Sequence, residues 1–455
     1  MAAADPCSDL HELDVVFERD AEAKNQQPRY AVYVMDISYF SGKLETYLRF
    51  KRISFTRIEV THKQFMTLFQ HTGLVQVPIL LDRSTGKYYR DTTSIIELFE
   101  SRPAEFLEPS SARRPVMPSN PEANFISQLL EDYFDEWMWT PALYYRWEPR
   151  LDAGNLARRF IKHDFMRDML VPMPDPVAEL VVIDRQHEEY VRAGGGVRDA
   201  AGKAMMEDIY KATLARLNAH FQQSPFVMGA QPSFADFGLM ASMFRHFALD
   251  PTPAKIMRLT APAVYEWVAR MWNASCLEVS DQLDTPLPDG VEPLVRDALK
   301  HYIPYLIANA RAVIAGESEV IVGPLRMKPV AFRAWSASRL VRAWEALDEH
   351  SKASLDSYCR GLGHNIHSLI DEGPLLAKAG AMWEAGAVVA PPHCVPHKPA
   401  SFLQGMLGTP NHQARLSLQL TPLTGGLLKL LAVILVSTRL NLVNKSTWLW
   451  SFASI

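Results

Sequence analysis

The segment Gln76-Val77-Pro78 stands at the entrance to an expected β-strand and is the first candidate for ligand recognition. Proline has no amide donor and is poorly tolerated inside a sheet, so Pro78 indicates either an edge strand or a cis peptide bond. With a cis bond, the amide and carbonyl of Val77 would turn outward and pair with an extended peptide, as an added strand does. The sequence leaves these two interpretations open.

Asp91 and Thr92 precede an expected helix, TTSIIELFES. They place a carboxylate, a hydroxyl and free backbone amides at a helix N-terminus. Such a site can hold a ligand carboxylate through the amides and the helix dipole, while Asp91 accepts a hydrogen bond from an ammonium group. The expected ligand is therefore a zwitterion, and simple helix capping is the competing interpretation.

Three hydroxyl groups, those of Ser38, Tyr39 and Ser41, lie where an expected strand gives way to a helix. In this order they are candidates to activate a bound thiol, and helix capping is the alternative role of Ser38. Lowering a thiol pKa of about 8.5 by about two units takes roughly 2.7 kcal/mol. A helix N-terminus supplies ~0.3 to 1 kcal/mol and a hydrogen bond to a charged group ~1.5 to 3 kcal/mol, which together can suffice.

The elements that would position these residues follow the order βαβαββα. Strands are expected from Tyr30 and over 53–60, and the segments VPILLD and KYYRD, joined by RSTG, predict a hairpin. From about Asn124 the apolar spacing is helical almost throughout and requires no strand. The fold class predicted is an α/β domain followed by an all-α domain.

Ser233 and Asp236, in the segment PSFADFGL, have the spacing of a capping box, so their predicted role is structural. Replacing Asp236 should impair folding before it impairs chemistry. Aromatic residues crowd the first helix of this half, and we expect most in the core and some in an apolar pocket. They are Tyr133, Trp137, Trp139, Tyr144 and Tyr145.

A further amphipathic region covers 291–316 and resumes over 332–347, with an expected buried stripe of Trp335, Leu340, Trp344 and Leu347. Residues 364–455 are expected to form a poorly ordered tail. Its apolar run, Leu427 to Val436, is short of the ~20 residues of a membrane span. Contact with a membrane surface stays open for this tail. Residues 1–29 carry no apolar stretch, so we expect a flexible leader.

Composition excludes several classes of function. A net charge of -4 supplies no broad basic field, so nucleic acid is not an expected partner. The four cysteines are too sparse for a disulfide framework and have no metal-like spacing, which favours a reducing cytoplasm and no metal. No cysteine lies between Tyr30 and Glu100, so disulfide exchange lacks its nucleophile there.

Four motifs in order over residues 30–273 resemble those of the glutathione transferase superfamily: SYFSGKLETYL, VPIL, DTTSIIELFE and PSFADFGL. The segment VEPLVRDALKHYIPYLIANARA resembles the further helical extension of some members. The resemblance implies a thioredoxin-like N-terminal domain over 30–103, a helical C-terminal domain over 120–285 and a helical extension over 286–363.

By this resemblance, the ligand and co-substrate is glutathione. Ser38 matches the catalytic position, Gln76 lies near the glycyl carboxylate, and Val77, before Pro78, anchors the cysteinyl unit. Asp91 with Thr92 would hold the γ-glutamyl end. Two departures weaken the catalytic match, because Tyr39 replaces a frequent proline and Thr92 replaces the usual serine.

The resemblance implies a glutathione transferase that conjugates glutathione to an apolar electrophile, as a cytoplasmic homodimer. The alternative is a non-catalytic adaptor that resembles metaxins, whose helical face binds proteins and whose tail touches a membrane. Retention on immobilised glutathione and loss of activity in Ser38→Ala would favour the enzyme. Membrane association lost on deleting residues 420–455 would favour the adaptor.

Overall fold

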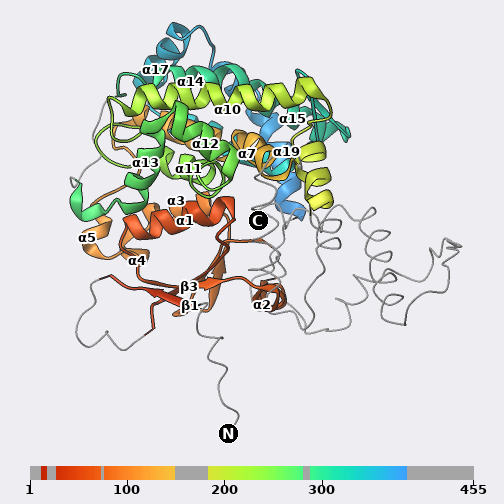
Figure 1. Ribbon diagram of the computed structural model, residues 1–455. Helices are drawn as coiled ribbons and strands as arrows, with labels where there is room; N and C mark the ends of the chain where they lie inside the picture. The colour runs from red at the N-terminus through yellow and green to blue at the C-terminus, as the bar shows by residue number, and fades with distance from the viewer. Residues whose placement is uncertain (1–11, 18–26, 73–75, 149–182, 280–286, 387–455) are drawn as a thin grey trace, which may run out of the picture.

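The computed structural model describes residues 12–17, 27–72, 76–148, 183–279 and 287–386. They form an N-terminal sheet with helices, a helical domain and a C-terminal extension (Figure 1). Figure 1 shows α1 and α3 between the sheet and the helical domain. The apolar run Leu427 to Val436 and the rest of 387–455 lie outside the described residues.

The N-terminal domain has a five-stranded sheet in the order β1-β3-β2-β4-β5. Strands β2 and β3 are parallel, whereas β4 pairs antiparallel with both β2 and β5. The predicted βαβαββα order is confirmed, and this is a thioredoxin-like domain. Its elements are β2 (Tyr30–Val34), α1 (Tyr39–Phe50), β3 (Phe55–Glu59), α2 (His62–Thr72), β4 (Ile79–Asp82), β5 (Lys87–Tyr89) and α3 (Thr92–Ser101).

Strand β1 (Glu12–Val15) adds a fifth strand to the sheet and pairs antiparallel with β3. The interpretation of residues 1–29 as a flexible leader is therefore wrong for this segment. The strand occupies an edge of the sheet, where four residues suffice to pair the exposed backbone of β3. Such a short segment has too little periodicity to be recognised in the sequence.

The second domain is helical, as predicted. Two short helices, α4 (Pro103–Phe106) and α5 (Pro109–Ala112), lead into it. The elements are α6 (Pro121–Asp132), η2 (Tyr133–Trp137), α7 (Trp139–Trp147), η5 (His187–Gly194), α10 (Ala200–Phe221), α11 (Phe234–Ser242), η6 (Met243–Phe247), α12 (Pro251–Thr260), α13 (Pro262–Asn273) and η7 (Cys276–Glu278). Three of these described elements, η2, η5 and η6, are π-helical, a form that is rare overall and often found at functional sites.

The extension differs from its prediction in two ways. A hairpin of β6 and β7 interrupts the helices, and helices continue beyond residue 363 to Gly386, so the predicted tail boundary is wrong. The last helix packs against α16 through small residues, a pattern that the apolar spacing alone did not reveal. The elements are α14 (Glu292–Asp297), η8 (Ala298–Tyr302), α15 (Ile303–Ala315), β6 (Val320–Val322), β7 (Leu325–Met327), α16 (Ala331–Glu345), α17 (Glu349–Gly361), α18 (His367–Ile370) and α19 (Gly373–Gly386).

Buried polar contacts fix the extension to the other two domains. The hydroxyl of Tyr302 donates to Asp132 at 2.9 Å, and Ser336 donates to the same carboxyl. Arg339 forms an ion pair with Glu97 of α3. Because these contacts reach both α3 and α6, the extension is part of the same folded body.

The predicted stripe on α16 is only partly a core. Leu340 and Trp344 are buried, at 3% and 4% exposure, whereas Leu347 is half-buried. Trp335 is half-buried and lines a cavity instead. The helical spacing identified the apolar face of α16, but it did not show whether that face packs in the core or lines a cavity.

Two glycines allow close backbone contacts in this part of the chain. A Cβ on Gly380 of α19 would lie 2.7 Å from the Cα of Trp335, so the two helices touch there without an intervening side chain. Gly196 has φ +70°, and a Cβ on it would lie 2.6 Å from the amide nitrogen of Arg326. The glycine triplet of the helical domain therefore receives the β6–β7 hairpin of the extension.

The contacts of Asp132 predict a pH dependence of stability. Burial raises the pKa of this carboxyl to about 6, above the ~3.9 of an unfolded aspartate. The folded protein keeps a proton that the unfolded chain releases, so the stability from this group is complete below pH ~4 and is lost as pH rises through ~6. The loss is on the order of 2 to 3 kcal/mol.

We therefore expect the melting temperature of the wild type, measured by circular dichroism, to fall more steeply than that of Asp132→Asn from about pH 4 to pH 6. Asparagine cannot ionise, so the variant lacks this contribution. Parallel slopes for the two proteins would show that Asp132 is ionised in the folded state throughout this range.

Across the described ranges, none of the helices is long and apolar enough to cross a membrane. The same ranges contain no cluster of three or more His, Cys, Asp or Glu residues arranged to hold a metal ion. Cys276 and Cys359 are free thiols and are buried.

Candidate functional site

A cavity of about 410 Å³ lies where the two domains and the extension meet. Its size is in the range of small-molecule sites, and its lining combines aromatic rings with a few polar groups. The N-terminal domain contributes Phe40, Gln76, Val77, Pro78, Arg90, Asp91, Thr92 and Ser94. The helical domain contributes Glu136, Trp139, Glu189, Tyr190 and Gly194, and the extension contributes Lys328, Val330, Phe332, Arg333, Trp335 and Trp383.

The Val77–Pro78 peptide bond, at one side of this cavity, is cis. Strand β4, which follows it, lies between β2 and β5, so the interpretation of Pro78 as an edge-strand proline is excluded. Among the described residues, neither the amide nor the carbonyl of Val77 has a hydrogen-bond partner. Val77 is 1% exposed and lines the cavity, and buried backbone groups are nearly always paired, so these two groups are the candidate contacts for a ligand.

Asp91 and Thr92 lie beside Val77 on the cavity wall. Asp91 is the N-cap of α3, and its side chain accepts a hydrogen bond from the amide of Ser94 at 2.7 Å. Its φ of 66° is uncommon for a residue other than glycine, and such conformations cluster at ligand sites. The Thr92 hydroxyl has no partner among the described residues. Helix capping and an open cavity wall are thus both present here.

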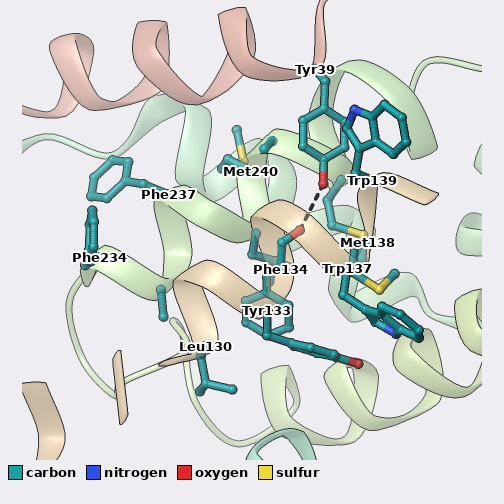
Figure 2. Close-up of a cluster of buried hydrophobic side chains, with 14 of the residues drawn as sticks. Tyr39, Leu130, Tyr133, Phe134, Trp137, Met138, Trp139, Phe234, Phe237 and Met240 are labelled. Carbon is teal, nitrogen blue, oxygen red and sulfur yellow. Dashed lines mark hydrogen bonds between the residues drawn. The ribbon is translucent and has the colours of Figure 1, made fainter. Parts of the chain in front are cut away.

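The three candidate hydroxyls of the first helix do not reach the cavity. Ser38 caps α1 by accepting from the amide of Ser41 at 3.3 Å. The Ser41 hydroxyl in turn accepts from the amide of Met35 at 3.3 Å. Tyr39 is buried between the domains, where its hydroxyl donates to the carbonyl of Phe134 at 2.9 Å (Figure 2). Only Phe40, from this segment, lines the cavity.

The helical domain closes over the start of α1, which explains this placement. Arg146 is fully buried, pairs with Asp250 at 2.9 Å and donates to the carbonyl of Ile37. The ring of His246 packs edge-on against Tyr39, with 5.2 Å between the centroids. Burial and the charge of Arg146 lower the pKa of His246 well below its usual value, so this ring is neutral.

Glu136 is a polar residue of the cavity that the sequence did not single out. It lies on the π-helical turn η2, and its Oε2 is 3.2 Å from Nε of Arg333. Burial raises the pKa of Glu136 to about 7, although Arg333 opposes the shift. The sequence signal for Glu136 was a carboxylate within the aromatic segment YFDEW. Charged residues are rarely buried without a partner, so an acidic residue among core aromatics indicates a special environment.

Aromatic rings form another part of the cavity wall. Phe332 stands between Trp335 and Trp383, with centroid distances of 5.5 and 5.2 Å. Trp139 completes the wall from α7. The other four aromatic residues predicted on the first helix of this domain lie in the core: Tyr133, Trp137, Tyr144 and Tyr145.

Charges in the cavity are balanced in number. Three cations line it, and three carboxylates line it with them. The cavity therefore has no strong preference for one sign of charge. The cations are Arg90, Lys328 and Arg333, and the carboxylates are Asp91, Glu136 and Glu189.

Comparison with known families assigns both domains. Residues 32–108 match the glutathione S-transferase N-terminal domain, and residues 197–274 match the glutathione S-transferase C-terminal domain. These two segments are therefore domains of the glutathione transferase superfamily, as the four motifs indicated. No curated protein sequence matches the chain.

Solved structures with similar folds cover somewhat more than half of the chain. The β-etherase LigF from Sphingobium sp. strain SYK-6 is 14% identical, with a TM-score of 0.37, and the match covers 59% of this chain and 99% of LigF. For the theta class glutathione S-transferase from Xanthomonas axonopodis pv. citri, with glutathione bound, the values are 14%, 0.32, 54% and 92%. For the tau class enzyme MiGSTU from mango, Mangifera indica, they are 13%, 0.35, 59% and 97%. At these TM-scores the assignment rests on the two family matches.

Proposed function

We propose that this protein binds glutathione in the cavity and conjugates its sulfur to an apolar electrophile. The observation that carries the proposal is the set of unpaired backbone groups at Val77 beside the capped helix start at Asp91 and Thr92. An extended peptide with a zwitterionic end has the groups that such a surface satisfies.

In this arrangement the backbone of Val77 pairs with the cysteinyl unit of glutathione. The start of α3 holds the γ-glutamyl end, with Asp91 as acceptor for the ammonium group. Gln76, which is half-buried on the cavity wall, faces the glycyl end. The aromatic wall from the extension leaves space for an apolar electrophile beside the thiol.

An adaptor without transferase activity is the second candidate, and one observation favours it. The hydroxyls of Ser38, Tyr39 and Ser41 are engaged within the fold, so the groups expected to activate the thiol are absent from the cavity. Their catalytic role stays a prediction. The two candidates differ in retention on immobilised glutathione and in turnover, both of which are expected of the enzyme alone.

The test is a calorimetric titration of glutathione into the purified chain and into Asp91→Ala. We expect saturable binding by the wild type and affinity about 10- to 100-fold weaker in the variant, because a hydrogen bond to a charged group contributes ~1.5 to 3 kcal/mol. Asp199→Ala is the matched control, since Asp199 also caps a helix, accepting from the Gly202 amide at 2.8 Å, but does not line the cavity. Absence of binding at millimolar glutathione, or equal affinities for all three proteins, would refute the proposal.

A further inference from the structure

Glu136 is the buried acidic residue of the described cavity wall. One of its carboxyl oxygens is paired with a cation, and the other has no hydrogen-bond partner. Glu136 is 7% exposed. Its Oε2 receives the hydrogen bond from Arg333, whereas its Oε1 has no hydrogen-bond partner among the described residues. Because Oε1 is unpaired and is not one of the solvent-inaccessible polar atoms, it is open to the cavity that Glu136 lines.

Arg333 holds this carboxyl in one orientation. The guanidinium is 4% exposed, donates to the hydroxyl of Tyr305, and lies 5.2 Å from the ring centroid of Trp139. A side chain fixed from three directions keeps its partner's geometry constant. The extension thus supplies the residue that orients the Glu136 carboxyl toward the cavity.

We propose that Glu136 is the catalytic base that accepts the proton of the glutathione thiol, with Arg333 as its positioning residue. This inference rests on the proposed function, because it needs glutathione in the cavity. It also accounts for the hydroxyls of α1, which serve helix capping and domain packing instead.

The proton balance closes for addition to an activated carbon–carbon double bond. The S–H bond breaks, its proton passes to Glu136, and the electron pair stays on sulfur. Sulfur then bonds to the electrophilic carbon while the π electrons move to the neighbouring carbon. That carbon takes the proton from Glu136, which returns to its carboxylate form.

The titration of Glu136 suits this role. Its pKa of about 7 leaves a substantial carboxylate fraction near neutral pH, where a base is most effective when its pKa matches the working pH. Arg333 favours the ionised form, and Asp91 across the cavity and Asp132 on its own helix oppose it. The neighbouring Asp135, Tyr39, Tyr302 and Tyr305 also interact electrostatically with this carboxyl.

The experiment measures the ultraviolet absorbance of bound glutathione thiolate from acid to alkaline pH, together with kcat/KM for a small activated alkene. We expect Glu136→Gln to lose the thiolate at neutral pH and to lower kcat/KM about 100-fold or more. Its calorimetric affinity for S-methylglutathione, which has no thiol proton, should equal that of the wild type. Glu136→Asp, which keeps a carboxylate, should restore part of the thiolate.

Two further variants and the S-methylglutathione measurement separate the possible outcomes. Glu189→Gln removes another carboxylate of the cavity and should leave the thiolate titration unchanged, whereas Ser38→Ala tests the hydroxyl that the sequence favoured. Thiolate formation retained in Glu136→Gln but lost in Ser38→Ala would overturn the inference. Loss of S-methylglutathione binding in Glu136→Gln would also overturn it, since Glu136 would then hold the ligand. If the wild type binds neither glutathione nor its S-methyl derivative, the proposed function itself fails.

Discussion

Asp236→Ala is expected to lower the free energy of unfolding by about 4 kcal/mol, since it leaves several buried donors without their acceptor. The fully buried carboxyl accepts from the amides of Val227 and Ser233, each at 2.9 Å, and from the Ser233 hydroxyl at 2.9 Å. It also accepts from the indole of Trp267 at 3.1 Å. The capping box is confirmed, and the same side chain ties α11 to a preceding loop and to α13.

The measurement is urea denaturation followed by circular dichroism. Asp348→Ala is the matched control, because Asp348 caps the exposed start of α17, accepting from Ser351 at 2.9 Å. Loss of an exposed cap costs about 1 kcal/mol. Equal losses in the two variants would mean that the buried contacts of Asp236 add nothing to ordinary capping.

Lys43→Met is expected to destabilise the protein by about 3 to 5 kcal/mol, because it leaves buried carboxylates without their cation. The fully buried ammonium of Lys43 contacts Glu131 at 2.5 Å, Asp135 at 2.9 Å and the Thr93 hydroxyl at 2.6 Å. Burial lowers the pKa of Lys43, but Asp135 and Glu131 raise it by more than burial lowers it, so the lysine stays charged. The cluster joins α1 and α3 to the helical domain.

The triple variant Lys43→Met, Glu131→Gln, Asp135→Asn should recover much of this loss, since it removes the unpaired charges. Lys352→Met is the control, because Lys352 forms a surface pair with Glu349 at 2.9 Å, and such pairs contribute under about 1 kcal/mol. Urea denaturation of the four proteins gives the comparison. A triple variant no more stable than Lys43→Met would indicate that the methionine itself fits poorly.

Five residues of the cavity wall could be predicted from local sequence. Local signals identify the positions just before a strand or at the start of a helix, and these are the positions of Gln76, Val77, Pro78, Asp91 and Thr92. The structure brings all five to one cavity wall. The chain order explains this, because Pro78 begins the β4–β5 hairpin and Asp91 follows it at the start of α3.

The rest of the site depends on contacts between distant segments. Ser38 follows Ile37, whose carbonyl accepts a hydrogen bond from the guanidinium of Arg146 in the helical domain. Trp335 has the helical spacing of a core residue, but it lines the cavity. Periodicity shows which face of a helix is apolar and carries no information on what lies against that face.

The contact at Gly380 makes the packing of the extension independent of the rings with which the extension lines the cavity. Main-chain atoms set the spacing of α16 and α19, because a Cβ on Gly380 would lie only 2.7 Å from the Cα of Trp335. The rings of Trp335 and Trp383, which project from the same two helices, do not set that distance. Their replacement can therefore alter which molecules are accepted while leaving the architecture intact, so selectivity in this chain can diverge without a matching cost in folding.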